Sequence, residues 1–402
     1  MNNIILFDDE NWKNFLPLTY TRPIGELRIG ILTIKEKWEK RLNGTVSYIT
    51  QDYLADKYPI QISNDNYIIN PRWLPNEKLI SLIKDLDLND ALLIDDTLVA
   101  ARMDNSQFQL LIENDEIQEL KGVDISKNKN DFISLNRPYD LNTYNEQELN
   151  LDFQLLTHNK SSQKCDAHSV LINESQIFIE EGAKINNVSL NASQGPIYIG
   201  KNTEIMEGSF IRGPFALCDN STVKMGSKVY GATTIGPFCK VGGEISSSIL
   251  LGYSNKSHDG YLGNSYIGEW CNLGAGTNCS NLKNNYTEVK IWDYNLDRFS
   301  PTGIQFCGLI MGDHSKSGIS TMFNTGTVIG VSANIFGSGY PRTFIPSFSW
   351  GGAKGYKTYL LSKSLEVAEI VMARRGLKLE ETDKLILEYI FHNSSTYRNW
   401  EI

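Results

Sequence analysis

The chain has 402 residues, of which 41% are hydrophobic and 21% are charged, and its formal net charge at pH 7 is -9. A chain of this length can form two or three domains with sizeable cores, and its composition has no signature of disorder. The negative net charge argues against nucleic-acid binding as the main function.

Cysteine spacing and hydropathy exclude further classes. The six cysteines lie far apart and form no C-x-x-C pair, so we expect free thiols and no metal site. The first residues lack the basic start of a signal peptide. No stretch approaches roughly 18 apolar residues, the length that would span a membrane. The pattern is typical of a cytoplasmic protein that does not engage a membrane.

The first part of the chain alternates between short apolar runs and amphipathic segments. The pattern predicts strands over residues 4–7 and 46–49 and helices over residues 31–42 and 76–86. Such alternation is typical of an α/β domain with a largely parallel sheet. Residues 91–103 differ, because two apolar runs flank Asp95 and Asp96, and this arrangement predicts a β-hairpin. Residues 104–130 are polar and charged, and the segment up to Leu156 is expected to lead into the next domain.

Every sixth residue from Ile199 to Val241 is aliphatic. The eight positions are Ile199, Ile205, Ile211, Leu217, Val223, Val229, Ile235 and Val241. Neither the helical period of 3.6 nor the strand period of 2 generates a period of six. A hexapeptide repeat does, because each short β segment points one aliphatic side chain inward before the chain turns. The repeat therefore predicts a left-handed parallel β-helix shaped as a triangular prism, and eight consecutive matches make coincidental spacing a poor alternative.

The repeat continues beyond Val241 with interruptions. It is expected to resume, six residues apart, at Tyr261, Ile267 and Leu273, and later at Met311, Ser317, Phe323, Ile329 and Ile335. Residues 283–300 form a polar insert. Breaks in a solenoid usually mark loops that project from one face, and such loops often build sites. Residues 360–372 and 382–391 have helical spacing, and we expect these helices to cover the open end of the solenoid.

One histidine stands at a break in the repeat. His258 lies among glycines and polar residues, without apolar neighbours in sequence. A loop histidine beside a coil is a candidate general base, because its pKa normally lies near the working pH of an enzyme. From chemistry alone, a surface histidine without a function is the favoured alternative.

The residues around His258 follow a recognisable order. Lys256 precedes His258, and the runs Tyr261-Leu262-Gly263-Asn264-Ser265 and Asn272-Leu273-Gly274-Ala275-Gly276-Thr277 follow it. This order resembles the acetyltransferase half of the bacterial bifunctional enzymes that make UDP-N-acetylglucosamine. In that family a glucosamine-1-phosphate N-acetyltransferase is fused to an N-acetylglucosamine-1-phosphate uridylyltransferase.

The resemblance implies roles for individual residues. It makes His258 the catalytic base, Lys256, Tyr261 and Asn272 substrate-binding residues, and Asn281 and Ser317 contacts of acetyl-CoA. It implies that acetyl-CoA is a substrate and that the acetyltransferase half needs no metal. Because hexapeptide acyltransferases generally bind acyl-CoA between neighbouring prisms, it also implies a homotrimer.

The chain departs from the family pattern at two places in the prism. The family has a phosphate-binding lysine about a dozen residues before the base, whereas residues 246–248 of this chain are serines. The tyrosine that follows the acetyl-CoA asparagine in the family is Leu282 here. Another cation would have to hold a sugar phosphate, and the candidates left open are Lys256, Lys224, Lys228 and Arg212. His314, in a polar turn, is interpreted as a turn residue.

The front of the chain resembles the family less closely. Residues 16–23 resemble the opening of the nucleotidyltransferase half, but they lack the glycines that let backbone amides surround phosphates. Arg22 and Arg28 are weak candidates for nucleotide binding. Mg²⁺ would be needed only if this domain is active, and for Asp95 and Asp96 a hairpin turn is favoured over a metal-binding role.

The predicted organisation has three parts. Residues 1–155 would form a reduced nucleotidyltransferase-like α/β domain, residues 156–345 the β-helix acyltransferase domain, and residues 346–402 a C-terminal helical extension. The predicted function is acetyl-CoA-dependent N-acetylation of an amino-sugar phosphate resembling glucosamine-1-phosphate, within the synthesis of UDP-N-acetylglucosamine or another cell-envelope sugar nucleotide.

Three other functions are weighed against this prediction. The first is a sugar-1-phosphate nucleotidyltransferase that uses a nucleoside triphosphate, and the second is a non-catalytic protein that binds sugar nucleotides. A carbonic anhydrase of the γ class shares the prism but needs three histidines on zinc. The histidines of the repeat region, His168, His258 and His314, are too widely separated in sequence to favour it.

Overall fold

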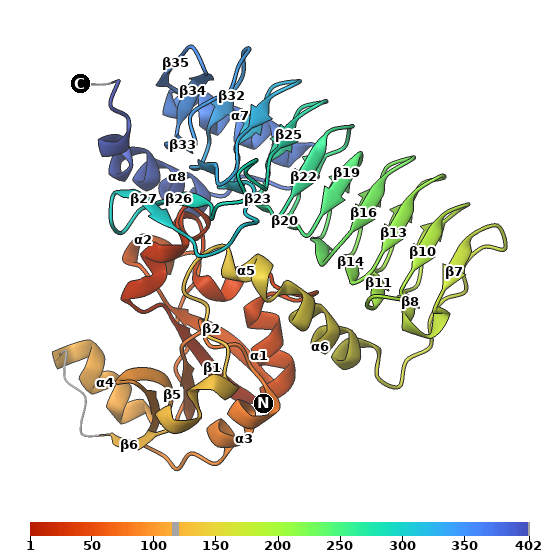
Figure 1. Ribbon diagram of the computed structural model, residues 1–402. Coiled ribbons are helices and arrows are strands. Elements are labelled where there is room, and N and C mark those ends of the chain that lie inside the picture. Colours follow the sequence, from red (N-terminus) through yellow and green to blue (C-terminus); the bar gives the residue numbers. More distant parts are fainter. Residues whose placement is uncertain (115–119, 401–402) are drawn as a thin grey trace. The chain divides into compact units, whose positions relative to one another are not determined.

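The computed structural model describes residues 1–114 and 120–400 (Figure 1). Contacts divide the chain into two compact units, each described here by itself. The first unit holds residues 1–15, 22–27 and 32–136, and the second holds residues 16–21, 28–31 and the chain from Arg137 onward. None of the helices in these described ranges is both long and apolar enough to cross a membrane.

The first unit contains a six-stranded sheet in the order β2-β1-β3-β5-β4-β6. Its strands are β1 (Asn2–Phe7), β2 (Gly44–Ile49), β3 (Asn66–Ile69), β4 (Asp90–Ile94), β5 (Thr97–Met103) and β6 (Lys121–Asp124). β1 pairs in parallel with β2 and β3, and β4 pairs in parallel with β6. β5 pairs antiparallel with both β3 and β4. The prediction of a largely parallel sheet is therefore confirmed only in part, because the hairpin of β4 and β5 reverses the strand direction.

The hairpin and two of the four α-helices described in this unit form where the sequence predicts them. Asp95 and Asp96 connect β4 to β5 with φ angles of 47° and 64°, the left-handed conformation that tight hairpin turns require. The helices are α1 (Ile34–Leu42), α2 (Asp52–Ala55), α3 (Glu77–Lys84) and α4 (Asn105–Asn114). The sequence predicts α1 and α3 but not α2. Thr33 caps α1 through a capping box with Glu36, and the side chain of Asn76 caps α3. The polar sequence gave no prediction of α4.

The second unit is built on three parallel sheets that form the sides of a prism (Figure 1). The eight-stranded sheet contains β7 (Val170–Ile172), β10 (Ser189–Asn191), β13 (Phe210–Arg212), β16 (Lys228–Tyr230), β19 (Glu244–Ser246), β22 (Tyr261–Gly263), β25 (Asn278–Cys279) and β30 (Met322–Phe323). The nine-stranded sheet contains β8 (Ile177–Ile179), β11 (Ile197–Ile199), β14 (Phe215–Leu217), β17 (Thr233–Ile235), β20 (Ile249–Gly252), β23 (Tyr266–Glu269), β28 (Ile310–Met311), β31 (Val328–Ile329) and β33 (Phe344–Ile345). The predicted left-handed β-helix is confirmed as the fold class of this unit.

The ten-stranded sheet forms the third side. It contains β9 (Lys184–Ile185), β12 (Glu204–Ile205), β15 (Thr222–Val223), β18 (Lys240–Val241), β21 (Asn255–Lys256), β24 (Asn272–Leu273), β29 (Lys316–Ser317), β32 (Asn334–Ile335), β34 (Ser349–Gly352) and β35 (Gly355–Thr358). The polar insert forms a separate hairpin of β26 (Lys290–Asp293) and β27 (Arg298–Pro301). Only the last pair of the ten-stranded sheet, β34 with β35, is antiparallel.

The interior of the prism is a stack of aliphatic side chains. All eight positions of the strict repeat belong to its core. The register predicted at Tyr261 is wrong by one residue, because Leu262 pairs with the inward Ile245 and is fully buried. The turn between β22 and β23 causes the shift, because the inward residues Leu262 and Ile267 are five positions apart, whereas Lys256 and Leu262 are six apart.

Helices α5 (Asp140–Thr143) and α6 (Asn145–Thr157) lead into the prism. Leu149 and Phe153 of α6 pack in one cluster with Phe178 and Tyr198 of the nine-stranded sheet. Residues 137–155 therefore belong by contacts to the second unit, whereas the predicted first domain extended to residue 155. Burial of the apolar face of α6 on the sheet explains the difference.

The C-terminal helices are α7 (Leu361–Ala373) and α8 (Glu381–Asn393). α7 does not lie across the end of the solenoid as predicted. Its Ala368 and Met372 pack in one cluster with Trp270, a residue at a corner in the middle of the prism. α8 contacts the last coil through Phe391, whose ring meets that of Phe348 edge-on at 5.0 Å. Burial of the apolar side chains of α7 against Trp270 therefore explains why this helix packs on the side of the prism.

Candidate functional site

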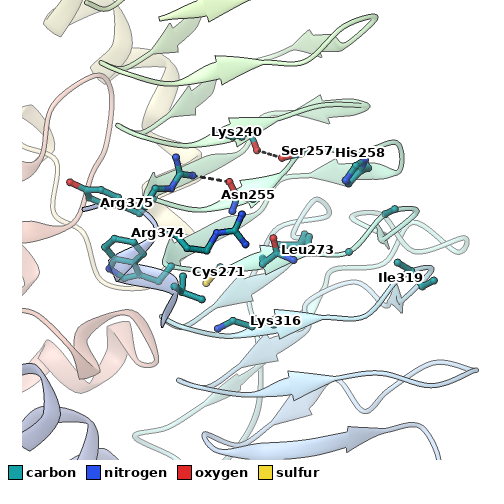
Figure 2. Close-up of a pocket in the computed structure, with 16 residues that line it drawn as sticks. Lys240, Asn255, Ser257, His258, Cys271, Leu273, Lys316, Ile319, Arg374 and Arg375 are labelled. Atoms are coloured by element: carbon teal, nitrogen blue, oxygen red, sulfur yellow. Dashed lines mark hydrogen bonds between the residues drawn. The ribbon is translucent and has the colours of Figure 1, made fainter. Parts of the chain in front are cut away.

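A cavity of about 670 Å³ lies between the outer face of the ten-stranded sheet and the C-terminal end of α7 (Figure 2). We call it the α7 cavity. Strands β18, β21, β24 and β29 contribute its floor, and the turns that follow β21 and β24 contribute one end. Val371, Arg374 and Arg375 contribute the side formed by α7. All of these elements belong to the second unit.

An aromatic ladder at one corner of the prism positions α7. The rings of Phe238 and Tyr253 stack 4.8 Å apart, and those of Tyr253 and Trp270 stack 4.3 Å apart. His314 continues the stack on the next coil, with its ring 6.3 Å from that of Trp270. All four residues have φ between 52° and 60°, a conformation that bulky side chains rarely adopt. Of these residues, Tyr253 and Trp270 also pack in one cluster with apolar side chains of α7.

His258 lies at one end of the α7 cavity, in the turn after β21 (Figure 2). The residue is exposed, so a substrate can reach its imidazole. Its backbone carbonyl accepts a hydrogen bond from the Nζ of Lys256 at 2.6 Å. The predicted base is therefore accessible, and its loop is tied to the interior of the prism.

Lys256 occupies an inward position of the ten-stranded sheet. Its register partner on β18 is Val241, and the lysine is only 1% exposed. Besides the carbonyl of His258, the Nζ reaches the carbonyl oxygen of Gly242 at 2.9 Å. Burial lowers the pKa of Lys256 to about 8, although the nearby charge of Asp259 acts in the opposite direction. The lysine does not line the α7 cavity, so its geometry supports a role in holding the loop rather than in contacting substrate.

Asn272 lines the same cavity as His258, so the structure brings these two predicted residues together. Tyr261 and Asn281 are not among the residues that line it. They form their own cluster, in which the Nδ2 of Asn281 donates to Tyr261 Oη at 3.1 Å and to Asn264 Oδ1 at 2.7 Å. Tyr261 belongs to β22 of the eight-stranded sheet. Burial raises its pKa above the usual range.

Ser317 lies inside the prism rather than in the cavity. It is in register with Leu273, and its Oγ lies 2.9 Å from the Oγ1 of Thr277. The backbone N–H of Gly274, a cavity residue, points to the same hydroxyl at 3.3 Å. Ser317 therefore supports the turn that lines the cavity from below.

The two arginines predicted to bind a nucleotide are buried. Arg22 is 6% exposed and Arg28 is 8% exposed. The guanidinium of Arg28 donates to the carbonyl oxygens of Ile31 and Leu251. These positions give no support to a phosphate role, which stays a prediction for both residues.

Sequence reasoning missed the cations of the α7 cavity. They are Lys240, Lys316, Arg374 and Arg375. The two lysines stand directly before inward positions of the repeat, and the arginines stand between α7 and Gly376, whose φ of 71° follows the helix end. Alternation along a strand could have placed the lysines on the outer face. Nothing in the sequence pattern indicates that α7 carries the arginines to the same place.

The described part of the chain holds no group of three or more His, Cys, Asp or Glu side chains placed to bind a metal ion. Its six cysteines are free thiols, and five of them are buried. Burial raises the pKa of Cys239, Cys279 and Cys307 to about 12, which keeps these thiols protonated at neutral pH.

Comparisons with known proteins match parts of the chain. Residues 4–161 match the family model described as sugar nucleotidyl transferase. The bifunctional protein GlmU of Methanocaldococcus jannaschii is 31% identical over 118 residues, which are 29% of this chain and 26% of the relative. The bifunctional sugar-1-phosphate nucleotidylyltransferase/acetyltransferase of Sulfurisphaera tokodaii is 31% identical over 155 residues, 38% of each chain. The GlmU protein of Methanococcus aeolicus is 27% identical over 222 residues, 55% of this chain and 46% of the relative.

These matches confirm the resemblance to the bifunctional family, with the low identity of divergent relatives. The chain spans less than half the length of these three curated relatives. Among solved structures, an Arabidopsis UDP-N-acetylglucosamine acyltransferase matches with 14% identity and a TM-score of 0.25, over 53% of this chain and 80% of that chain. PerB from Caulobacter crescentus matches with 10% identity and a TM-score of 0.19, over 89% and 97% of the two chains.

Proposed function

We propose that this chain, a divergent relative of the bifunctional sugar-1-phosphate nucleotidylyltransferase/acetyltransferases, transfers an acetyl group from acetyl-CoA to the amine of an amino-sugar phosphate. The observation that carries the proposal is the common cavity of His258 and Asn272, two residues of the motif shared with that family. The proposed acceptor resembles glucosamine-1-phosphate.

The reaction requires one proton transfer before the new bond forms. The acceptor's ammonium loses a proton to solvent, and the neutral imidazole of His258 takes a second proton as the nitrogen attacks the thioester carbonyl. The tetrahedral intermediate then collapses, the C–S bond breaks, and the imidazolium returns its proton to the departing coenzyme A sulfur. The products are an N-acetylated sugar and coenzyme A.

The oxyanion of that intermediate needs a hydrogen-bond donor. The turn of Gly274 and Ala275 lines the cavity together with His258. Within the described chain, the backbone N–H of Gly274 is bonded to Ser317, whereas that of Ala275 has no hydrogen-bond acceptor. We therefore assign the Ala275 N–H as the candidate donor to the oxyanion.

Lys256 acts in this proposal as a positioning residue. Its two hydrogen bonds, to the carbonyl oxygens of His258 and Gly242, join the turn that carries the base to the coil below it. A loop held at both ends loses less freedom when substrate binds, which favours the productive geometry.

Tyr261 and Asn281 do not line the cavity, and this observation concerns the number of chains that form the active site. The cavity lies on the ten-stranded sheet and Tyr261 lies on the eight-stranded sheet, so a neighbouring copy would present its own Tyr261 and Asn281 to complete the site. The proposal therefore includes a homotrimer. Light scattering should give three times the chain mass of 45.3 kDa, and a stable monomer that turns over substrate would contradict this part of the proposal.

A second candidate function belongs to the first unit. The family match over residues 4–161 favours nucleotidyl transfer from a nucleoside triphosphate to a sugar 1-phosphate. Such transfer normally uses Mg²⁺, but no cluster of three or more acidic side chains, histidines or cysteines occurs in the described residues. We derive no step through the ion. Pyrophosphate release from a nucleoside triphosphate by purified protein would establish this function.

The acetyltransferase proposal is tested by measuring coenzyme A release from acetyl-CoA with glucosamine-1-phosphate as acceptor. His258→Ala should lower kcat by roughly 10²- to 10⁴-fold, the usual contribution of a general base. His168→Ala is the matched control, because His168 is also exposed but does not line the cavity. Turnover that survives His258→Ala would remove the assignment of the base. Absence of turnover in the wild type, with this and other amino sugars, would favour the nucleotidyltransferase or binding-protein function.

A further inference from the structure

The α7 cavity concentrates positive charge in a protein whose formal net charge is -9. Four cationic side chains line it: Lys240, Lys316, Arg374 and Arg375. No carboxylate is among its described lining residues, and none of the four cations forms a salt bridge within the described chain. The cavity therefore presents positive charge that no carboxylate among its described lining residues neutralises.

The cations from the sheet are arranged with two amides in a single row. Lys240 is in register with Asn255, Asn255 with Asn272, and Asn272 with Lys316. Because neighbouring strands lie about 4.8 Å apart, the row presents ammonium, amide, amide and ammonium groups at regular spacing. All of these groups can donate hydrogen bonds. The row is thus a set of donors on the floor of the cavity.

The arginines from α7 close over this row. Arg375 donates from its Nη2 to Asn255 Oδ1 at 3.2 Å, which fixes the side chain over the floor. Figure 2 shows Arg374 and Arg375 on one side of the cavity and His258 at the opposite end. The guanidinium group offers paired N–H donors that match phosphate oxygens. The donors therefore come from two separate parts of the fold.

The electrostatics of Lys240 support this assignment. Burial is the main cause that lowers its pKa below the usual value, and the charges of Arg375, Lys224 and Arg374 lower it further. Burial also lowers the pKa of Lys316. Clustered like charges repel one another, and a bound anion would relieve this repulsion.

A purely structural explanation accounts for only part of the cluster. Cations near the C-terminus of a helix are stabilised by the helix dipole, which would suffice for Arg374 and Arg375. It does not explain the lysines on the sheet, nor the absence of carboxylates among the described residues of the cavity. The presence of the lysines of the row and of the two arginines in one cavity therefore needs a single explanation.

We propose that the row of Lys240, Asn255, Asn272 and Lys316, together with Arg374 and Arg375, is a subsite for a phosphate ester. It rests on the proposed function in that the phosphate belongs to one of the two substrates. The sugar phosphate and the phosphates of coenzyme A share this chemistry.

Calorimetric binding to the full-length protein distinguishes the two sources. Each phosphorylated ligand is compared with a phosphate-free counterpart: glucosamine-1-phosphate with glucosamine, and coenzyme A with pantetheine, which lacks the adenosine as well as the phosphates. We expect the double variant Arg374→Gln/Arg375→Gln to weaken binding of one phosphorylated ligand at least tenfold. Binding of its phosphate-free counterpart should not change. The pair that responds identifies which substrate the subsite holds.

Two controls keep the result interpretable. Lys378→Gln removes one charge from the exposed segment after α7 that does not line the cavity, and it should bind like the wild type. Thermal unfolding of each variant shows whether α7 remains packed, so a loss of fold is not mistaken for a loss of charge. Lys240→Gln, on the sheet, should weaken binding of the same ligand as the arginine variant.

The outcomes separate this inference from the proposed function. Equal binding of both phosphorylated ligands by the wild type and the arginine variant would overturn the subsite, and so would wild-type protein that binds neither. If the wild type binds with phosphate selectivity that the variant loses, yet never acetylates an amino sugar, the subsite stands and the proposed function fails. If turnover depends on His258 but the KM values of the arginine variant match those of the wild type, the subsite alone is wrong.

Discussion

The two faces of the ten-stranded sheet show how one strand serves two purposes. On β21, Lys256 points into the prism and Asn255 points into the α7 cavity. From β9 to β32, the inward column is aliphatic apart from Lys256 and Ser317, and it is shared by successive coils of the scaffold. The outward row differs from coil to coil and contains the lysines and asparagines of the cavity. A scaffold repeat therefore leaves every second residue free for chemistry.

The largest effect is expected when an inward and an outward residue of the same strand, β18, are exchanged separately. Val241 is completely buried, whereas Lys240 faces the cavity. Val241→Asp places an unpaired charge in the core, which costs several kcal/mol, and we expect the β-helix not to fold. Lys240→Asp should fold like the wild type and lose affinity for the phosphorylated ligand. Circular dichroism with urea denaturation compares the folding of the two variants, and calorimetry measures the ligand affinity of Lys240→Asp. Equal stability of the two variants would contradict the assignment of the two faces.

The next largest effect is expected at the aromatic ladder. Trp270→Ala should lower the free energy of unfolding by about 3–5 kcal/mol, the usual cost of truncating a buried aromatic residue. It should also weaken binding of the phosphorylated ligand, because α7 packs on this ring. Trp350→Ala is the control, since the ring of Trp350 meets that of Phe336 edge-on and that of Tyr359 at a tilt, and Trp350 does not line the cavity. Ligand affinity that survives Trp270→Ala would show that the ladder does not position α7.

Lys256 should make stability depend on pH. Its pKa is about 8 in the folded protein and near 10.5 in the unfolded chain, so the unfolded state binds more protons between these values. Stability contributed by this residue therefore rises with pH from about 8 to about 10.5, by up to about 3 kcal/mol.

The variant Lys256→Met isolates that contribution. The difference in unfolding free energy between wild type and variant should change over this pH window, and a constant difference would contradict the assigned burial of the ammonium. Because the variant also releases the carbonyl of His258, we expect kcat to fall while KM for the acceptor changes little. A change in KM alone would instead indicate the direct substrate contact that the family resemblance implies.

The smallest effect is expected for Ser317→Ala. The hydroxyl is buried and shared with Thr277, and its loss should cost about 1 kcal/mol. Since Ser317 lies beneath the cavity, KM for acetyl-CoA should change less than threefold. A large rise in this KM, without loss of stability, would support the direct contact with acetyl-CoA that the resemblance implies.

The sequence alone predicts the scaffold wherever burial of apolar side chains is the dominant cause of the fold. Burial of one side chain every six residues predicts the interior from Ile199 to Val241, and the helix cap at Asn76 agrees with the predicted start. The first helix begins at Ile34, three residues later than predicted. The prediction fails where turns change length. Leu262, rather than Tyr261, is buried because the turn after β22 is one residue short, which places the inward residues Leu262 and Ile267 five positions apart.

The candidate site is predictable only in part, for two physical reasons. The motif identifies His258 and Asn272, which the structure places in one cavity. It does not separate Lys256 and Ser317, which point inward, from residues that point outward. The arginines of α7 depend on a contact between Trp270 and a helix about a hundred residues later in the chain, and such tertiary contacts leave no local pattern.

Chemical rescue of His258→Ala by imidazole tests the central claim most directly. The variant removes the base but leaves the cavity and its cations in place, so free imidazole can enter and accept the proton. We predict that coenzyme A release by the variant rises with imidazole concentration, while His168→Ala shows no such dependence. Full activity of His258→Ala without imidazole would contradict the account, and so would an inactive variant that imidazole does not restore although it binds both substrates.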